Sequence, residues 1–405
     1  MPLLSTRLEF VSTSATAKIH NLILKKQNAG ESIINLSVGE SDFDTPRNIQ
    51  KAAHTAIING KTRYTSTDGL DRLKVAISNK LLRENLLKYE KKELIIAAGG
   101  KQVIFNALIA TLNPNDEVII PSPYWVSYPD IVNLCNGKPI IIPTDIKNNF
   151  KIKPNQLKKS VNSNTKWIIF NSPSNPSGSV YTEEELIEFC QILDDFPHIN
   201  IMSDDIYEHI IFDGLTFKNV VQVNPSLKNR TLLVNGVSKA YAMTGWRIGY
   251  GASNETLIKA MTIIQSQSTS NASSISQHAA IEALENTQEF TLKNKVIYQN
   301  RRDKLITILS KSKFIEVVKP MGSFYAFPSI QKLIGRKSIN GNIIKSDKEF
   351  VIELLNETGV AVVPGSAFGL KNTFRISFAV TEALLEEACS LIVDFVDSLK
   401  CGNRE

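Results

Sequence analysis

The sequence predicts an α/β protein built on a mostly parallel, seven-stranded sheet covered by helices, with a smaller α+β domain beside it. From residue 93 onward, short apolar runs alternate with amphipathic patterns of helix length, which is typical of parallel strands joined by helices. We expect strands at 94–97, 117–120, 139–142, 166–170, 200–203, 231–234 and 246–250, and helices at 100–112, 125–133, 182–193 and 255–266. Catalytic groups should then gather at the carboxyl ends of the strands.

The smaller domain is predicted from the two ends of the chain. A helical pattern from 276 to about 309, with a break, precedes expected strands at 315–318, 323–327 and 374–379 and helices at 347–358 and 383–399. Earlier helical patterns occupy 15–27, 47–59 and 70–84, and Asp44-Thr-Pro46 is expected to cap the second of these. We expect residues 1–45 to join the small domain, 46–290 to form the large domain, and 291–405 to complete the small one.

The composition is that of an ordinary globular protein. The chain has 405 residues, of which 42% are hydrophobic and 21% charged, and its net charge of +6 is spread thinly enough to argue against nucleic-acid binding. We expect no membrane contact, because no apolar run approaches the length of a spanning helix. The four cysteines show no CxxC spacing and the five histidines no HExxH spacing, so we expect reduced thiols, a cytoplasmic location and no metal site.

A lysine at the end of an expected core strand is the main candidate for chemistry. Lys239 follows Ser238 in a loop of small residues, where loss of water would lower its pKa and suit it to form a Schiff base. Arg247 returns to the same place, and with Ser238 it would suit an anionic phosphate. Ser-Lys is a common dipeptide, so an ordinary surface loop is the alternative at this stage.

Three further loops follow expected strands. Gly99, Gly100 and Lys101 open a helix, and their backbone N–H groups could approach a phosphate, although many strand-to-helix turns contain Gly-Gly. Trp125 could stack on a planar ring or pack in the core. Asn175 lies in a rigid loop with two prolines, which could hold its side chain at a fixed angle or serve only as a turn.

Two charged positions follow or interrupt very apolar strands. Asp204 and Tyr207 lie three residues apart after one strand. Burying a carboxylate there costs free energy unless a cation faces it. The alternative is that Asp204 caps the N-terminus of a helix. Arg375 lies in the middle of another apolar strand, where a bidentate carboxylate ligand is a natural partner.

Taken in order, these motifs resemble the fold-type I aminotransferases that use pyridoxal 5′-phosphate, and the similarity to their bacterial subgroup Ib aspartate aminotransferase branch extends over essentially the whole chain. The matching stretches are Gly39-Glu-Ser-Asp-Phe-Asp-Thr-Pro46, Gly99-Gly-Lys-Gln102, Ser122-Pro-Tyr-Trp-Val-Ser-Tyr-Pro129, Asn171-Ser-Pro-Ser-Asn-Pro-Ser-Gly178, Ser203-Asp-Asp-Ile-Tyr-Glu-His209, Ser238-Lys-Ala-Tyr-Ala-Met-Thr-Gly-Trp-Arg-Ile-Gly-Tyr250 and Phe374-Arg-Ile-Ser377. Each motif is weak alone, but their joint order is specific.

The resemblance implies the cofactor pyridoxal 5′-phosphate and a role for each residue. Lys239 would bind the cofactor as a Schiff base and move the substrate proton, Asp204 would pair with the pyridine nitrogen, and Tyr207 and Asn175 would bind the phenolic oxygen. Trp125 would stack on the ring. The phosphate would be held by the backbone of Gly99, Gly100 and Lys101, by Ser238, by Arg247 and by Tyr64 of the partner subunit, which implies a homodimer with shared active sites.

The resemblance also implies amino-acid and 2-oxo-acid substrates. Arg375 would bind the α-carboxylate, assisted by Asn175, Gly39 and Trp125, whereas Lys101 and Thr16 would bind a distal carboxylate. This favours an aspartate:2-oxoglutarate aminotransferase, with a glutamate/aspartate–prephenate or broader aromatic aminotransferase as the alternative. A β-lyase, and a non-catalytic regulatory domain on the same fold, are competing interpretations.

Three positions depart from the family pattern. Ser41 replaces a usual proline and is expected to loosen the substrate loop, and Ser177 replaces a threonine. Gly236 stands where many relatives carry a phosphate-binding serine, so Ser238 and Arg247 are expected to contribute more to phosphate binding.

Overall fold

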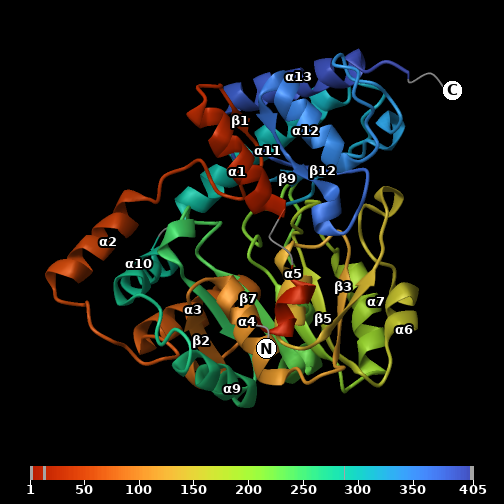
Figure 1. The fold of residues 1–405 in the computed structure, drawn as a ribbon. Helices are drawn as coiled ribbons and strands as arrows, with labels where there is room; N and C mark the ends of the chain where they lie inside the picture. Colours follow the sequence, from red (N-terminus) through yellow and green to blue (C-terminus); the bar gives the residue numbers. More distant parts are fainter. Residues whose placement is uncertain (1–2, 12–14, 287, 402–405) are drawn as a thin grey trace.

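The computed structural model describes residues 3–11, 15–286 and 288–401. Its larger part is a seven-stranded sheet of order β2-β8-β7-β6-β5-β3-β4, with helices on both faces (Figure 1). All strands run parallel except β8, which is antiparallel to both of its neighbours. The strands are β2 Leu94–Ala97, β3 Glu117–Pro121, β4 Lys138–Ile142, β5 Thr165–Asn171, β6 Asn200–Asp204, β7 Thr231–Gly236 and β8 Gly249–Ala252. The predicted fold class is confirmed.

The central strands are apolar because both faces of the sheet are covered. Successive side chains of a strand point to opposite faces. On β7, Leu233 packs into one apolar core, whereas Leu232 and Val234 pack into another. The first core includes side chains of α2 Arg47–Ile58, α3 Asp71–Asn85, α6 Pro154–Ser160, α7 Glu183–Asp194, α8 Val220–Val223 and α10 Ser274–Glu285. The second includes side chains of α4 Gly100–Thr111, α5 Ser127–Leu134 and α9 Glu255–Ser266.

The smaller part lies at the other end of the molecule and combines residues 15–35 with the C-terminal part of the chain, whereas residues 6–10 lie against α5 of the larger part (Figure 1). Its antiparallel sheet has the order β11-β12-β9, and β1 pairs in parallel with β10. These strands are β1 Ile34–Asn35, β9 Tyr325–Ala326, β10 Val360–Ala361, β11 Val363–Pro364 and β12 Phe374–Ser377. The helices are α1 Ala15–Asn28, α11 Glu289–Leu309, α12 Asp347–Thr358 and α13 Glu382–Ser398. Ile23 of α1 and Leu36 share one apolar core with Phe350 and Ile376.

Three local predictions are wrong. Residues 315–318 form no strand beyond an isolated bridge between Glu316 and Ser329. The last strand of the large sheet begins at Gly249, because the chain turns at Arg247 with a left-handed φ of 56°. Helix α2 begins after Pro46 without a side-chain cap, since the Thr45 hydroxyl donates to the Ala242 carbonyl at 2.6 Å instead. Among the described helices, none is long and apolar enough to cross a membrane.

Candidate active site

A cleft of about 600 Å³ opens at the carboxyl ends of the parallel strands, where the smaller part of the molecule meets the sheet. This is the place at which an open α/β sheet normally binds ligands. Eleven of the residues singled out from the sequence line the cleft: Gly39, Gly100, Lys101, Trp125, Asn175, Asp204, Tyr207, Ser238, Lys239, Arg247 and Arg375.

Lys239 lies three residues beyond the end of β7 and points into the cleft. Its Nζ donates a hydrogen bond to the carbonyl oxygen of Gly39 at 2.6 Å. Burial lowers the pKa of Lys239 to about 8, and the positive charge of Arg375 adds to that effect. A neutral partner and a lowered pKa leave a substantial fraction of this amine unprotonated near neutral pH, which is the state that attacks a carbonyl carbon.

Asp204 ends β6 and is only 6% exposed. The hydroxyl of Tyr128 donates to its Oδ2 at 2.5 Å, and burial raises the pKa of Asp204 to about 6. Asp204 caps no helix, since the next described helix, α8, begins at Val220. Within the described part of the chain no cationic side chain forms an ion pair with Asp204, so its carboxylate suits a cationic or N–H-bearing ligand.

Sequence reasoning did not identify Tyr128 as a site residue, although it lies in the same motif as Trp125. The two residues are three apart at the start of α5, a spacing that places them on one side of a helix, and their rings pack edge to face at 5.2 Å. Tyr128 is buried, and its hydrogen bond helps to fix the position of the Asp204 carboxylate. The spacing was the available signal, but nothing in the sequence identified the carboxylate as its partner.

Arg375 lies on β12 and is 4% exposed. Its guanidinium donates to Asn175 Oδ1 at 3.0 Å and to the Ser37 carbonyl at 2.6 Å, and its centre lies 4.4 Å from the ring centroid of Tyr325. The buried Nε has no partner. Every partner is neutral, so the charge of this arginine is available to an anionic ligand.

Tyr207 and Gly39 complete the wall of the cleft around Tyr325. The hydroxyl groups of Tyr207 and Tyr325 lie 2.9 Å apart. A Cβ on Gly39 would come within 2.4 Å of the Tyr325 hydroxyl, so only glycine fits there without rearrangement. Tyr325 therefore lies against three predicted site residues, Tyr207, Gly39 and Arg375, and no sequence pattern indicated this position.

The opposite end of the cleft is formed by the beginning of α4. Gly99 itself does not line the cleft, but its φ is +90°, and a Cβ there would lie 2.2 Å from Arg247 Nη2. Arg247 reaches across this helix end and donates to the carbonyl oxygens of Thr244 at 2.8 Å and Ala98 at 3.2 Å. The N–H groups of the first helical turn, the helix dipole and the guanidinium together suit a phosphate.

Gly236 has a steric explanation. A Cβ at this position would lie 2.8 Å from the carbonyl oxygen of Ile248, on the chain segment that enters β8. A serine would therefore require the backbone to shift. The absence of a side chain here follows from the close approach of β7 to the turn after Arg247.

Lys101 and Trp125 lie together at the mouth of the cleft. The Nζ of Lys101 is 4.9 Å from the centroid of the Trp125 ring, within the range of a cation–π contact. Partial burial lowers the pKa of Lys101, and the positive charge of Arg247 contributes. Within the described residues no carboxylate forms an ion pair with Lys101, so it faces the cleft without an acidic partner, as Arg375 and Arg247 do.

The predicted roles of two further residues are not tested by this cleft. Tyr64 is 91% exposed and lies outside the lining of the cleft in the single chain. Thr16 belongs to α1, but its side chain lies outside the described residues. The predicted roles of both residues stay predictions.

Comparison with known proteins identifies the family. Residues 31–392 match the family model described as aminotransferase class I and II. The chain belongs to this aminotransferase family. It is 51% identical to a Rickettsia conorii protein named "Probable aspartate/prephenate aminotransferase", over 98% of this chain and 99% of that protein.

Two further relatives extend the comparison. This aminotransferase is 50% identical to the aspartate/prephenate aminotransferase of Cereibacter sphaeroides, over 98% of this chain and all of that protein (100%). The crystal structure of the aspartate aminotransferase from Rhizobium meliloti superposes with a TM-score of 0.96 at 44% identity, covering 99% of this chain and 100% of that one.

Membership implies pyridoxal phosphate as the cofactor, and the cleft of this aminotransferase fits it. The amine of Lys239, with its lowered pKa, suits an aldehyde carbon. The buried Asp204 carboxylate lacks a cation and suits a protonated ring nitrogen. The start of α4 and Arg247 suit the phosphate.

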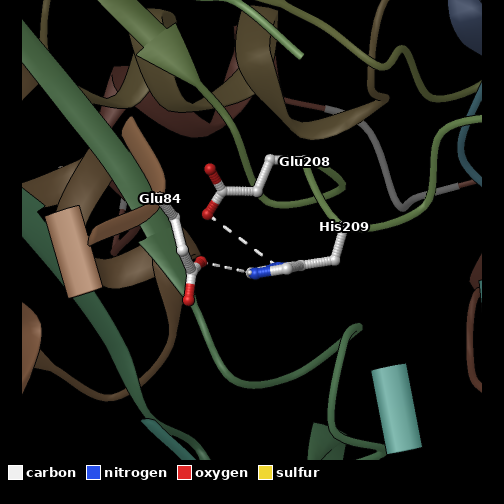
Figure 2. Close-up of side chains that lie close together, drawn as sticks. All are labelled: Glu84, Glu208 and His209. Carbon is white, nitrogen blue, oxygen red and sulfur yellow. Dashed lines mark hydrogen bonds and ion pairs between the residues drawn. The ribbon is translucent and has the colours of Figure 1, made fainter. Parts of the chain in front are cut away.

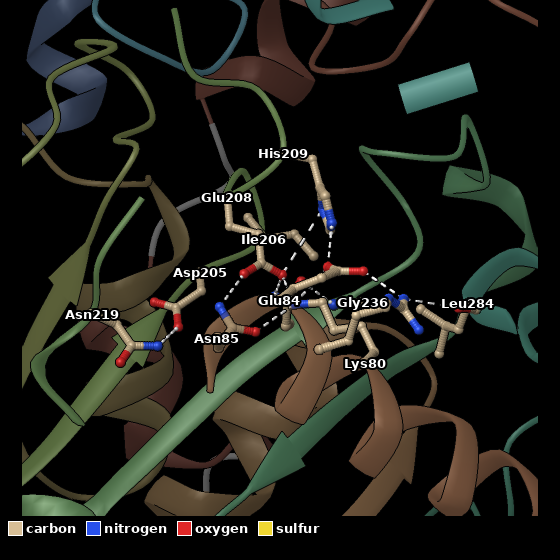
Figure 3. A network of polar contacts seen from close by, with 12 residues as sticks. Lys80, Glu84, Asn85, Asp205, Ile206, Glu208, His209, Asn219, Gly236 and Leu284 are labelled. Carbon is tan, nitrogen blue, oxygen red and sulfur yellow. Dashed lines mark hydrogen bonds and ion pairs between the residues drawn. The ribbon is translucent and has the colours of Figure 1, made fainter. Parts of the chain in front are cut away.

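A second polar cluster lies behind the cleft of this aminotransferase. Glu84, Glu208 and His209 carry ligand-type atoms within 4.8 Å of one another, and His209 Nε2 lies 2.9 Å from Glu84 Oε2 (Figure 2). Figure 3 shows Lys80 and Asn85 of α3 in the same network. The Lys80 ammonium donates to Glu208 and lies 3.5 Å from Glu84. This lysine supplies the positive charge that a metal ion would otherwise bring.

Proposed function

We propose that the protein catalyses transamination between L-aspartate and 2-oxoglutarate, giving oxaloacetate and L-glutamate. One observation carries the proposal. Apart from Arg247, which the cofactor phosphate would occupy, the cleft around the Lys239 amine contains two cationic side chains without acidic partners, Arg375 and Lys101. These two suit the two carboxylates of a dicarboxylic amino acid.

Bound pyridoxal phosphate would supply an electron sink for the negative charge that develops on the substrate α-carbon. Asp204 would keep the ring nitrogen protonated, since its buried carboxylate would gain a positive partner in this way. Lys239 Nζ would accept the proton from the α-carbon of the amino acid and return it to the carbon on the other side of the nitrogen, as the base and acid of a 1,3-proton shift. Tyr207 and Asn175 would donate to the phenolic oxygen, and Trp125 would stack on the ring.

Substrate orientation follows from the fixed position of Arg375. The guanidinium is buried among Ser37, Asn175 and Tyr325, so it binds the α-carboxylate with little loss of side-chain entropy. Gly39 contributes backbone at the same place. Lys101, which also lines the cleft, would bind the distal carboxylate, with Thr16 as its expected partner from the sequence.

Prephenate is the second candidate substrate. Two relatives at about half identity carry the name aspartate/prephenate aminotransferase. Prephenate also carries two carboxylates, so the same pair of cations accommodates it if the cleft admits the larger ring. An aromatic amino acid without a distal charge would leave Lys101 without a counterion, which disfavours a purely aromatic specificity.

We further propose a cytoplasmic homodimer in which Tyr64 of the partner subunit contacts the cofactor phosphate. The 91% exposure of Tyr64 in the single chain supports a role at an interface, because a large aromatic side chain is rarely left so open. Arg247 is exposed in the single chain at the same end of the cleft, where a partner would cover it.

The test compares amino donors in single-turnover experiments with aspartate, glutamate, phenylalanine and alanine, and acceptors with 2-oxoglutarate and prephenate. We expect aspartate to react faster than phenylalanine, and Lys101→Ala to reduce kcat/KM for aspartate at least tenfold while leaving alanine within about twofold. The exposed Lys259→Ala serves as the matched control. A faster reaction with phenylalanine, or equal losses for aspartate and alanine, would contradict the dicarboxylate assignment.

A further inference from the structure

The loop from Ser37 to Phe43 contacts two of the cationic side chains of the cleft, Arg375 and Lys239. Its Ser37 carbonyl accepts from Arg375, and its Gly39 carbonyl accepts from Lys239. On the other side, Gly39 has no room for a side chain against Tyr325. A displacement of this loop would therefore move the backbone that faces the substrate α-carboxylate and would change the contacts of Arg375 and Lys239 together.

The same loop is attached to helix α11 by two polar contacts. Ser41 Oγ lies 2.8 Å from the hydroxyl of Tyr298 and also accepts the Phe43 N–H at 3.3 Å. Asp42 receives two hydrogen bonds from Arg301, at 2.8 and 2.7 Å. Tyr298 and Arg301 are three residues apart on α11, so they present both contacts on one side of the helix.

Aromatic packing continues from this attachment towards the cleft. Phe43 packs edge to face on Tyr298 at 5.6 Å, and Tyr298 packs on Phe324 at 5.5 Å. Phe324 in turn contacts Tyr325 at 4.8 Å and Tyr207 at 5.4 Å. Tyr298 is 1% exposed, so its hydroxyl depends on Ser41 as a hydrogen-bond partner.

We propose that Ser41 and Tyr298 form a positioning pair that holds the Ser37–Gly39 backbone against Arg375 and Lys239 and thereby sets the affinity for the substrate α-carboxylate. A proline at position 41 would restrict the loop through its own ring. In this chain a hydrogen bond to α11 takes the place of that restriction, so the serine does not loosen the loop. The inference rests on the proposed transaminase function for its kinetic readout only.

The kinetic test uses the cofactor-loaded enzyme and its best amino donor. Ser41→Ala and Tyr298→Phe should each raise KM about fivefold, the ratio that corresponds to the ~1 kcal/mol net contribution of one hydrogen bond, with kcat within about twofold. Because the two residues share one contact, the double variant should be no worse than either single variant. Ser41→Thr keeps the hydroxyl and should retain the original KM.

Matched controls remove similar hydroxyl groups away from the loop. Ser312 donates to Asp397 at 2.6 Å and accepts the Phe314 N–H at 3.3 Å, the same arrangement as that of Ser41, so Ser312→Ala controls for loss of a serine bridge. Tyr181 is a buried tyrosine whose hydroxyl accepts the Ile152 N–H at 3.3 Å, and Tyr181→Phe controls for Tyr298→Phe. Neither control should change KM.

A second readout requires no activity. In the cofactor-free protein, amide hydrogen exchange of residues 40–44 should be faster in Ser41→Ala and Tyr298→Phe than in the original protein and unchanged in Ser312→Ala. Unchanged exchange in this loop, additive KM effects, or a fall in kcat at constant KM would each overturn the proposal. Absence of transamination in the original protein would instead refute the proposed function. The exchange result would still show whether Ser41 and Tyr298 hold the loop in place.

Discussion

Lys239 and Lys80 both lie within the large sheet region, and their surroundings are opposite. Lys239 faces the cleft with one neutral partner, the Gly39 carbonyl, and its pKa falls to about 8. Lys80 is 1% exposed on α3 and donates to Glu208 and, at 2.9 Å, to Asn85 Oδ1. Burial of a lysine therefore does not by itself make it reactive, and the presence or absence of a carboxylate partner decides.

The carboxylates follow the same rule. Burial disfavours the charged form of Glu208, but Lys80 and His209 outweigh burial and hold the pKa of Glu208 below its usual value. Asn85 and Asn235 also donate to Glu208, at 2.8 and 2.6 Å. Asp204 has no such cation, and burial raises its pKa to about 6. Within the network in Figure 3, Lys80, Glu84, Glu208 and His209 satisfy one another's charges, whereas the cleft leaves charges to be satisfied by ligands.

Exchanging each lysine for methionine should separate the two roles. We expect Lys239→Met to reduce kcat by at least about a thousandfold, since the group that moves the proton is lost, without lowering the unfolding free energy of the cofactor-free protein. Turnover and urea unfolding measure the two effects. Retention of a tenth of the activity would contradict the role of Lys239.

Lys80→Met should have the reverse effect. Removing one partner of a buried ion pair leaves Glu208 uncompensated, so we expect the unfolding free energy to fall by ~3–5 kcal/mol, with kcat per folded molecule within about threefold. Replacing Glu208 by leucine in the same protein should recover part of the loss. If Lys80→Met left stability unchanged, the network would not have the structural role assigned to it.

Asp204→Asn should stabilise the cofactor-free protein at alkaline pH. Because the folded-state pKa of Asp204 is raised from 3.8 to about 6, the folded protein binds more protons than the unfolded chain between these values, and stability falls as pH rises through that window. The penalty above pH 6 is on the order of 3 kcal/mol. Thermal unfolding should show the variant to be more stable at pH 8, with the difference disappearing near pH 4. A constant difference across this range would contradict ionisation of a buried Asp204.

The pH dependence that Lys239 contributes to stability has the opposite sign. Its folded-state pKa is lowered from 10.5 to about 8, so its burial costs stability below pH 8, and that cost is relieved as pH rises towards 10.5. The neutral amine is the nucleophile, so attachment of pyridoxal phosphate to the cofactor-free protein should accelerate up to about tenfold per pH unit below 8 and level off above it. Stopped-flow absorbance measures this rate. A rate that is flat between pH 6 and 8 would require another amine or another limiting step.

The fold could be predicted because buried parallel strands are continuous apolar runs, and seven such runs matched the seven strands of the large sheet. The prediction of strands from apolar runs failed where apolar residues do not pair with a neighbouring strand. Trp246 and Ile248 suggested a strand, but Arg247 adopts a left-handed turn between them. The domain boundaries after residues 45 and 290 stay a prediction.

The site was less accessible to sequence reasoning. Order and spacing pointed to Lys239, Asp204 and Arg375, because their motifs are local. Tyr128 and Tyr325 depend on contacts with residues 76 and 118 positions away along the chain, and the Lys80–Glu208 pair spans 128 positions. Such pairings arise from tertiary packing, so no local pattern signals them.

The most direct test of the contrast between the two lysines is chemical trapping. The protein is loaded with pyridoxal phosphate, reduced with borohydride, digested and analysed by peptide mass spectrometry. We predict a single stoichiometric label on the peptide that contains Lys239, with Lys80 unlabelled. Labelling at another lysine, or no label on the Lys239 peptide, would contradict the assignment of Lys239 as the reactive amine.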